Sequence, residues 1–295
     1  IMISGILNVN KEVGISSNKC VSLVKKALNT RKVGHTGTLD LEAYGVLPIV
    51  IGKATRVSDY LMDDKKEYIT EAVFGKRTDT LDYSGEVLDT SDIVFDKDQL
   101  LEVMEGFKGE ITQIPPMYSA IKVNGQKLYD LARKGVEIER KVRKVSIYEF
   151  EILEYEFPKA KFKITCSKGT YIRTLIDDLG DKLGSFAYVD SLCRSKVGDF
   201  FIENSVKSQD LLSMDKDQLL SKLKPVDFAL SSYKKVTLPN TYYKQAINGM
   251  TMLVENYYGD ELVRVYIGDE FIGLAKSSIG NDRNFLKMDK VFYER

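Results

Sequence analysis

The sequence predicts an α+β protein that ends in a small β-rich domain. Strand-like apolar segments and amphipathic helical segments follow one another as far as about residue 231, and mostly short strands with turn residues come after it. At 295 residues, of which 43% are apolar, the chain is long enough for one large core and a second, smaller one. We therefore expect one domain at 1–231 and another at 232–295.

Strands in the first domain are indicated by apolar or alternating runs, and helices by apolar residues at helical spacing after a capping residue. Ser16 or Ser17 is a candidate helix cap, and Asp96-x-x-Gln99 has the form of a capping box. The expected strands are 5–9, 46–51, 68–74, 145–155 and 161–166, and the expected helices are 17–28, 54–62, 100–107, 127–134, 172–183 and 208–222.

The second domain is expected to contain a strand, a short helix and a hairpin. The strand is predicted at 234–238 and the helix at 242–248, ended by Gly249. The hairpin is predicted at 262–267 and 271–275, because Gly268-Asp269 between them favours a tight turn.

One loop stands out from the predicted strands and helices. Between Gly34 and Gly45 the chain places three glycines and two threonines around its only histidine and one aspartate, Asp40. This composition disfavours both helix and strand and predicts a shaped loop that presents one carboxylate. From local chemistry alone, an Asx turn or a helix cap is the commoner use of such an aspartate. A Walker phosphate loop is excluded, because Gly52-Lys53 is followed by alanine.

Composition excludes several classes of protein. No apolar run is long enough to cross a bilayer, and the first residues do not resemble a signal peptide. Cys20, Cys166 and Cys193 lie far apart without the spacing of metal ligands, and a single histidine makes a His-rich metal site impossible. We therefore expect a cytoplasmic protein with reduced thiols, no metal and no membrane partner.

Charge is balanced over the whole chain but segregated along it. Residues 11–56 and 119–144 each hold eight Lys or Arg against three acids, whereas 86–110 holds eight acids against two lysines. Two cationic surfaces on a neutral protein are typical of a polyanion partner, although solvated helix faces would give the same pattern.

Three motifs in order resemble the TruB family of bacterial tRNA pseudouridine-55 synthases. They are GHTGTLDLEAYGVLPIVIGKATR at 34–56, Lys66-x-Tyr68, and Ser167-Lys-Gly-Thr-Tyr-Ile-Arg-Thr-Leu175. The segment 113–135 is also similar to the RNA-gripping insertion of that family, here at about 118–144. One departure is Leu41, which stands where the family usually has proline.

The resemblance implies the fold and the activity. The fold would be a mixed, largely antiparallel sheet with flanking helices and a cleft across its middle, followed by a small PUA-like RNA-binding domain. The activity would be isomerisation of the T-loop uridine at position 55 of tRNA to pseudouridine, after the base is flipped out. The implied partner is the T-arm of tRNA, with no cofactor and no obligate protein partner.

The resemblance also assigns roles to particular residues. Asp40 takes the position of the nucleophile, Arg173 points at that carboxylate, and Tyr68 stacks on the target base and is the candidate to take its C5 proton. The residues placed on the substrate side, besides Tyr68, are His35, Tyr171, Leu192 and Lys11. Of these, His35 fills space in the RNA loop, Tyr171 and Leu192 complete the base pocket, and Lys11 supports the catalytic loop.

Other interpretations remain open from the sequence. Arg173 could pair on its own helix with Asp177, four residues further on. The polar turn from Arg77 to Asp82 is interpreted as structural, since it lacks the ligand pattern of a calcium loop. The whole chain could be a non-catalytic RNA-binding protein on the same fold. A glycosidase is a third class, but it needs a second carboxylate that the three motifs do not supply.

Overall fold

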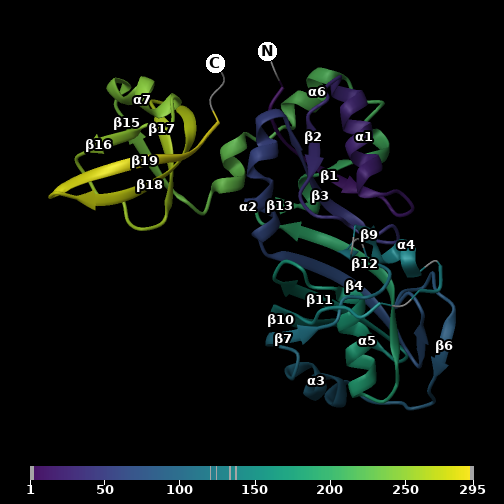
Figure 1. The fold of residues 1–295 in the computed structure, drawn as a ribbon. Helices are drawn as coiled ribbons and strands as arrows, with labels where there is room; N and C mark the ends of the chain where they lie inside the picture. Colours follow the sequence, from purple (N-terminus) through teal and green to yellow (C-terminus); the bar gives the residue numbers. More distant parts are fainter. Residues whose placement is uncertain (1–2, 120, 124, 133, 137, 293–295) are drawn as a thin grey trace. The chain divides into compact units, whose positions relative to one another are not determined.

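The computed structural model describes residues 3–292 except 120, 124, 133 and 137 (Figure 1). The chain forms two compact units, residues 1–223 and 224–295. Among the described helices, none combines the length and the apolar character that crossing a bilayer requires.

The first unit is built on one large sheet. Its described strands follow the order β14-β1-β3-β12-β4-β11-β10-β7, with β2 beside β3 and β13 beside β12. Only the pairs β1–β14 and β3–β12 are parallel, so the predicted mixed, largely antiparallel sheet is confirmed. The strands are β1 (Gly5–Lys11), β2 (Val33–His35), β3 (Tyr44–Ile51), β4 (Lys66–Phe74), β7 (Gly109–Gln113), β10 (Arg143–Glu156), β11 (Lys159–Cys166), β12 (Ala187–Val197), β13 (Phe200–Phe201) and β14 (Val206–Lys207).

Helices cover this sheet at both ends of the unit (Figure 1). At one end α1 (Ser17–Leu28) and α6 (Lys216–Ser221) pack on β1 and β3, and at the other α3 (Lys97–Glu105) and α5 (Ile172–Lys182) pack on the central strands. The predicted caps are present, because Ser16 Oγ accepts from Lys19 N at 3.1 Å and Asp96 and Gln99 form a capping box.

The loop around Asp40 crosses between two hydrophobic cores. Leu39 and Ala43 pack in the core under α3 and α5, whereas Leu47 and Ile49, a few residues later in β3, pack in the core under α1. Buried side chains of one core therefore fix the chain on both sides of Asp40, and the strand that follows is fixed in the other core.

Several elements differ from the sequence prediction. The expected helix at 54–62 is a 3-10 turn η1 (Gly52–Val57) followed by α2 (Ser58–Asp63). The expected helix at 208–222 is wrong over most of its length, since a 3-10 turn η3 (Ser208–Asp210) and a bend precede α6. Strands β2, β7, β12, β13 and β14 of the large sheet were not predicted. Two short hairpins were also missed: β5 (Lys76–Thr78) with β6 (Val87–Thr90), and β8 (Lys122–Val123) with β9 (Gln126–Lys127). In the second unit, the strands at 251–254 and 283–291 were missed as well. Next to β9, α4 (Leu128–Ala132) is shorter than expected.

The second unit is β-rich, as predicted. Its sheet has the order β15-β17-β18-β19-β16, with α7 (Tyr243–Ile247) packed against it. The short helix η4 (Val226–Leu230) also belongs to this unit, where Asp227 accepts a hydrogen bond from the Tyr266 hydroxyl. The strands are β15 (Lys234–Leu238), β16 (Thr251–Val254), β17 (Leu262–Ile267), β18 (Glu270–Gly280) and β19 (Arg283–Val291).

Candidate active site

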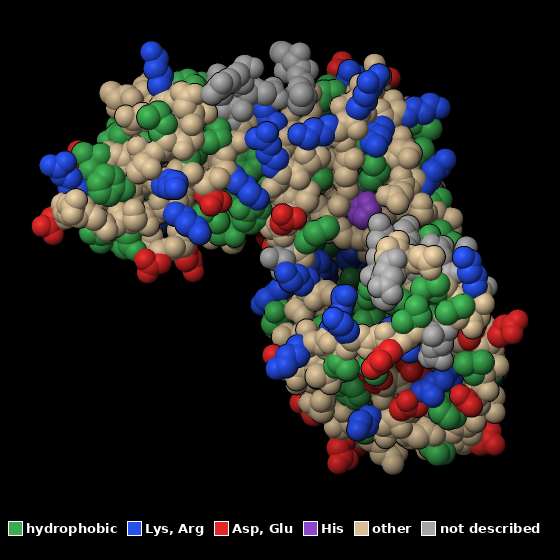
Figure 2. All heavy atoms as spheres, in the orientation of Figure 1, with side chains coloured by type: hydrophobic (Ala, Val, Ile, Leu, Met, Phe, Trp, Pro, Cys, Tyr) green, Lys and Arg blue, Asp and Glu red, His purple; other side chains and the backbone are tan. Residues whose placement is uncertain are grey.

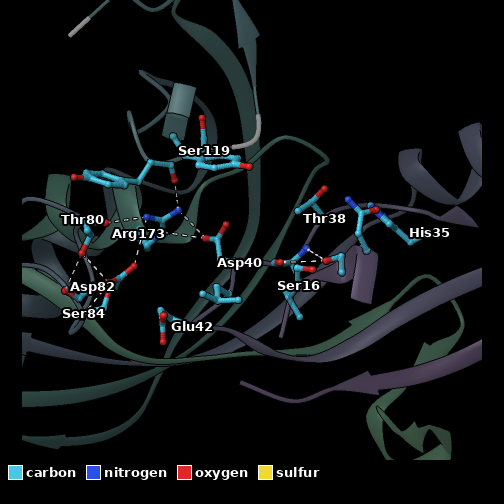
Figure 3. Close-up of a pocket in the computed structure, with 16 residues that line it drawn as sticks. Ser16, His35, Thr38, Asp40, Glu42, Thr80, Asp82, Ser84, Ser119 and Arg173 are labelled. Carbon is cyan, nitrogen blue, oxygen red and sulfur yellow. Dashed lines mark hydrogen bonds and ion pairs between the residues drawn. The ribbon is translucent and has the colours of Figure 1, made fainter. Parts of the chain in front are cut away.

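Asp40 lies in the loop that joins β2 to β3, and this loop is held at its backbone (Figure 3). Ser17, the first residue of α1, accepts from Leu39 N at 2.9 Å and donates to Leu39 O at 3.1 Å. Ala43 N donates to Asp40 O at 3.2 Å and closes a turn. The carboxylate of Asp40 therefore projects from a fixed backbone.

Lys11 supports the same loop from within the protein. Its side chain is fully buried, and Nζ donates to Glu12 O and Ile15 O at 2.9 Å each and to Leu41 O at 3.4 Å. Burial lowers the pKa of the ammonium to about 8. Lys11 therefore holds the backbone on both sides of the loop from the buried side of the protein.

The replacement of the usual proline by Leu41 leaves this support in place. The side chain of Leu41 is 45% exposed, and its carbonyl accepts from Gly14 N at 2.9 Å as well as from Lys11. A proline carbonyl would accept the same two bonds, so the backbone contacts do not depend on which residue stands here.

Arg173 contacts Asp40, as predicted (Figure 3). Its Nε and Nη2 lie 3.0 and 2.8 Å from Asp40 Oδ2, while Nη1 donates to Thr80 O at 2.8 Å and Nη2 to Tyr118 O at 2.7 Å. The guanidinium is 5% exposed, whereas the Asp40 side chain is 38% exposed. A buried, fully engaged cation thus holds a carboxylate that solvent and substrate can reach.

The alternative pair within the helix is wrong. Asp177 pairs with Arg77, whose Nε lies 2.6 Å from Asp177 Oδ1, and Arg77 also contacts Asp181. Arg77 stands on β5, so this ion pair ties the β5–β6 hairpin to α5 and leaves Arg173 to the loop.

Asp82 is a residue of the site that the sequence analysis interpreted as structural. Its Oδ1 accepts from Thr80 Oγ1 at 2.8 Å and from both the backbone and the side chain of Ser84, as expected of a turn aspartate. Its Oδ2, however, lies 3.5 Å from Arg173 Nη1, and the side chain is 9% exposed. Arg173 therefore lies between two carboxylates, of which Asp40 is the more exposed.

Besides a cavity of only about 10 Å³, Asp40 lines two larger cavities. The larger, of about 570 Å³, extends from His35 and the start of α1 to Tyr118 and Tyr129 (Figure 3). The smaller, of about 70 Å³, is lined by Asp40 and Arg173 together with Tyr68, Tyr171 and Leu192. The structure therefore brings five of the predicted site residues to the small cavity. The larger cavity beside it is called the groove below.

The walls of the small cavity come from three parts of the fold. Tyr68 stands on β4, Leu192 on β12, and Tyr171 precedes α5, where its backbone N–H and C=O both bond to the buried amide of Gln113, at 3.0 and 3.2 Å. Burial raises the pKa of Tyr68, and the cation of Arg194 opposes that rise. Burial also raises the pKa of Tyr171.

His35 lies on the wall of the larger cavity, beyond Thr38 from Asp40 (Figure 3). Its Nδ1 accepts from Gly37 N at 3.4 Å, and burial, helped by Arg194, lowers its pKa below the ordinary value of 6.5. The imidazole is therefore neutral at pH 7 and is placed to contact whatever fills the groove.

The site combines a partly exposed carboxylate, the buried arginine that holds it, and a small cavity walled by two tyrosines. This arrangement suits an enzyme that uses a carboxylate on a planar group. The profile of the TruB family pseudouridylate synthase N-terminal domain matches residues 25–172, and that of the tRNA pseudouridylate synthase B C-terminal domain matches 173–231. The chain belongs to the TruB family of pseudouridylate synthases.

Relatives and solved structures agree with this assignment. The chain is 44% identical to the tRNA pseudouridine synthase B of Clostridium kluyveri, over 98% of this chain and 99% of the relative, and 41% identical to that of Alkaliphilus oremlandii, over 99% of each. The fold is similar to a chain in the crystal structure of a Cbf5-Nop10-Gar1 complex, with a TM-score of 0.74 and 27% identity over 98% of this chain and 85% of that one.

Proposed function

We propose that this enzyme isomerises the T-loop uridine at position 55 of tRNA to pseudouridine, with Asp40 as the nucleophile. The observation that carries the proposal is the Asp40 carboxylate on Arg173, which lines both the small cavity and the larger groove. The alternative, a non-catalytic RNA-binding protein on this fold, leaves that pair without a use.

The reaction is an isomerisation, so it needs no oxidant and no second substrate. The bond from N1 of the base to C1′ breaks, the base turns, and a bond from C5 to C1′ forms as C5 loses its proton and N1 gains one. Asp40 acts at the sugar, either on C1′ or on the 2′ proton. Tyr68, on the wall of the same cavity, takes the C5 proton directly or through water. Arg173 keeps the carboxylate oriented and balances its charge.

The two cavities divide the substrate between them. Flipping a base from its stack costs a few kcal/mol, and stacking on an aromatic side chain returns about 1–3 kcal/mol. Tyr68 and Tyr171, with Leu192, receive the flipped base in the small cavity, and the rest of the T-loop lies along the groove past His35.

The cations near the groove support an RNA substrate. Lys19, Lys25 and Lys26 on α1, with Arg31 and Lys32 after it, are exposed, and none has an ion-pair partner within the described part of the chain. The helix starts at Ser16–Asn18, which line the groove. By contrast, Lys159, Lys161 and Lys163 on β11 all pair with acids. Figure 2 shows Lys and Arg side chains around His35, the only histidine. Unpaired cations on and after the helix whose first turn lines the groove fit a phosphate backbone.

The T-arm would also be held by the insertion at about 118–144 and by the β-rich C-terminal domain, proposed at 232–295. Cys20, Cys166 and Cys193 are free and buried, which is consistent with an enzyme of the reducing cytoplasm.

An unmodified tRNA transcript tests the proposal directly. Incubation should yield pseudouridine at position 55 in the wild type and none in Asp40→Asn, and a transcript with cytidine at position 55 serves as the substrate control. A protein that binds the transcript but forms no pseudouridine is the non-catalytic alternative, and release of free uracil would identify a hydrolase.

A further inference from the structure

Arg194 is a buried cation that has no acidic partner among the residues the structure describes. Its side chain is on β12, the residue is 3% exposed, and no described carboxylate lies within ion-pair distance of it. Burying an unpaired charge is costly, so its donors must be satisfied in another way. Nε donates to Val46 O at 2.8 Å and Nη2 to Gly37 O at 3.1 Å.

These two carbonyls stand at the two ends of the segment that carries Asp40. Gly37 precedes it and Val46 follows it, so one planar guanidinium fixes the spacing of the loop ends. Backbone contact reinforces this link, because β3 approaches β12 closely at Gly45. A Cβ at Gly45 would lie 2.3 Å from Arg194 O, and its φ of +114° is one that residues with a side chain rarely adopt.

Arg194 is also the cross-strand neighbour of Tyr68. The two residues are register partners in the antiparallel pair of β12 and β4. Side chains of directly opposite residues lie on the same face of a sheet, with Cβ atoms about 5 Å apart. The guanidinium counteracts the effect of burial on the pKa of the Tyr68 phenol. One cation thus holds both ends of the segment that carries Asp40 and lies opposite Tyr68 on the adjacent strand.

We propose that Arg194 is a positioning residue for catalysis, which ties together the two ends of the Asp40 loop and orients the Tyr68 phenol from the adjacent strand. The catalytic part of this inference rests on the proposed function. Arg194 lines neither cavity, so it acts on the substrate through Asp40 and Tyr68.

Arg194→Met and Arg194→Lys test the proposal, with Arg264→Met as the matched control. Arg264 also donates to two backbone carbonyls, of Tyr233 and Ser231, but in the C-terminal unit. Methionine removes the charge while filling much of the volume, an exchange that proteins often tolerate. Lysine keeps the charge beside Tyr68 but can reach only one of the two carbonyls.

Two measurements are needed: the rate of pseudouridine formation, and hydrogen exchange, which requires no catalysis. Under single-turnover conditions with saturating enzyme, Arg194→Met should lose about 100-fold in rate, since a loop displaced by about 1 Å costs that much. Its Kd for tRNA should stay within about threefold, because phosphate contacts carry most of the affinity. Arg194→Lys should recover part of the rate. Hydrogen exchange of amides at 38–46 should accelerate in Arg194→Met and not in Arg264→Met.

The outcomes separate this proposal from the proposed function. A wild type that forms no pseudouridine would refute the function, while exchange at 38–46 would still report on Arg194. Unchanged exchange in Arg194→Met, or an unchanged rate in the folded variant, would overturn the positioning role. Arg194→Met should also cost less in a Tyr68→Phe background than in the wild type, and fully additive losses would refute the link to Tyr68.

Discussion

Exchange of Arg173 for lysine tests how Asp40 is held. The guanidinium gives a hydrogen bond from Nε and an ion-pair contact from Nη2 to Asp40 Oδ2, and one hydrogen bond each to the carbonyls of Thr80 and Tyr118. A lysine ammonium can keep a contact with the carboxylate, but it cannot reproduce the planar fork and loses about two of these bonds. At roughly 1.5 kcal/mol for each hydrogen bond to a charged group, the loss is about 3 kcal/mol, or roughly 150-fold in rate.

Release of tritium from C5-labelled uridine in a tRNA transcript measures this loss under single-turnover conditions. Arg173→Ala, which removes every contact, should approach the inactivity of Asp40→Asn. Thermal unfolding and tRNA binding of both Arg173 variants serve as controls for fold and docking. A folded lysine variant with the wild-type rate would refute the reasoning, and so would a loss confined to the Kd for tRNA.

Asp40→Asn should abolish pseudouridine formation and leave the Kd for tRNA within about tenfold, and measurable turnover after deamidation is excluded would contradict its role. Tyr68→Phe should keep stacking but lose most of the rate, whereas a fully active variant would make Tyr68 a platform only. Lys11 has a folded pKa of about 8, below its value in the unfolded chain, so the unfolded state binds more protons between about pH 8 and 10.5. The stability of the wild type relative to Lys11→Met should therefore rise with pH across that window in urea titrations, and a flat difference would mean that the ammonium is not buried in solution. Removal of residues 224–295 should weaken binding of full-length tRNA, and equal affinity in a folded truncated protein would show that this unit does not dock RNA.

The parts of the fold that the sequence predicted are those with a strong local pattern. Strands β3, β4 and β11 are almost continuous or alternating apolar runs, and α1 and α3 carry side-chain caps. Strand β12 was missed because its polar residues interrupt the alternation of apolar and polar side chains that marks a strand. Two register shifts in its pairing with β4 disturb this alternation further. A buried arginine in a strand has no signature in hydrophobic periodicity.

The sequence predicted those side chains of the site that belong to recognisable motifs. Asp40 and Arg173 stand in separate motifs, and the resemblance linked them, as the ion pair confirms. The contact of Asp82 with Arg173 could not be predicted from spacing, because the turn and α5 meet only in the folded sheet. The carbonyls of Thr80 and Tyr118 are backbone groups, which every residue type supplies and which therefore leave no trace in a sequence.

The bond from Arg173 Nη2 to Tyr118 O has a mechanical consequence. Tyr118 begins the insertion proposed to grip the RNA, so the same guanidinium joins this insertion to Asp40, the proposed nucleophile. An RNA that leaves the insertion in a different position changes the donors available to Asp40, even when it binds well. Discrimination between RNAs is then expected in the rate of the chemical step more than in affinity, which makes turnover, and not a binding screen, the measurement that identifies true substrates.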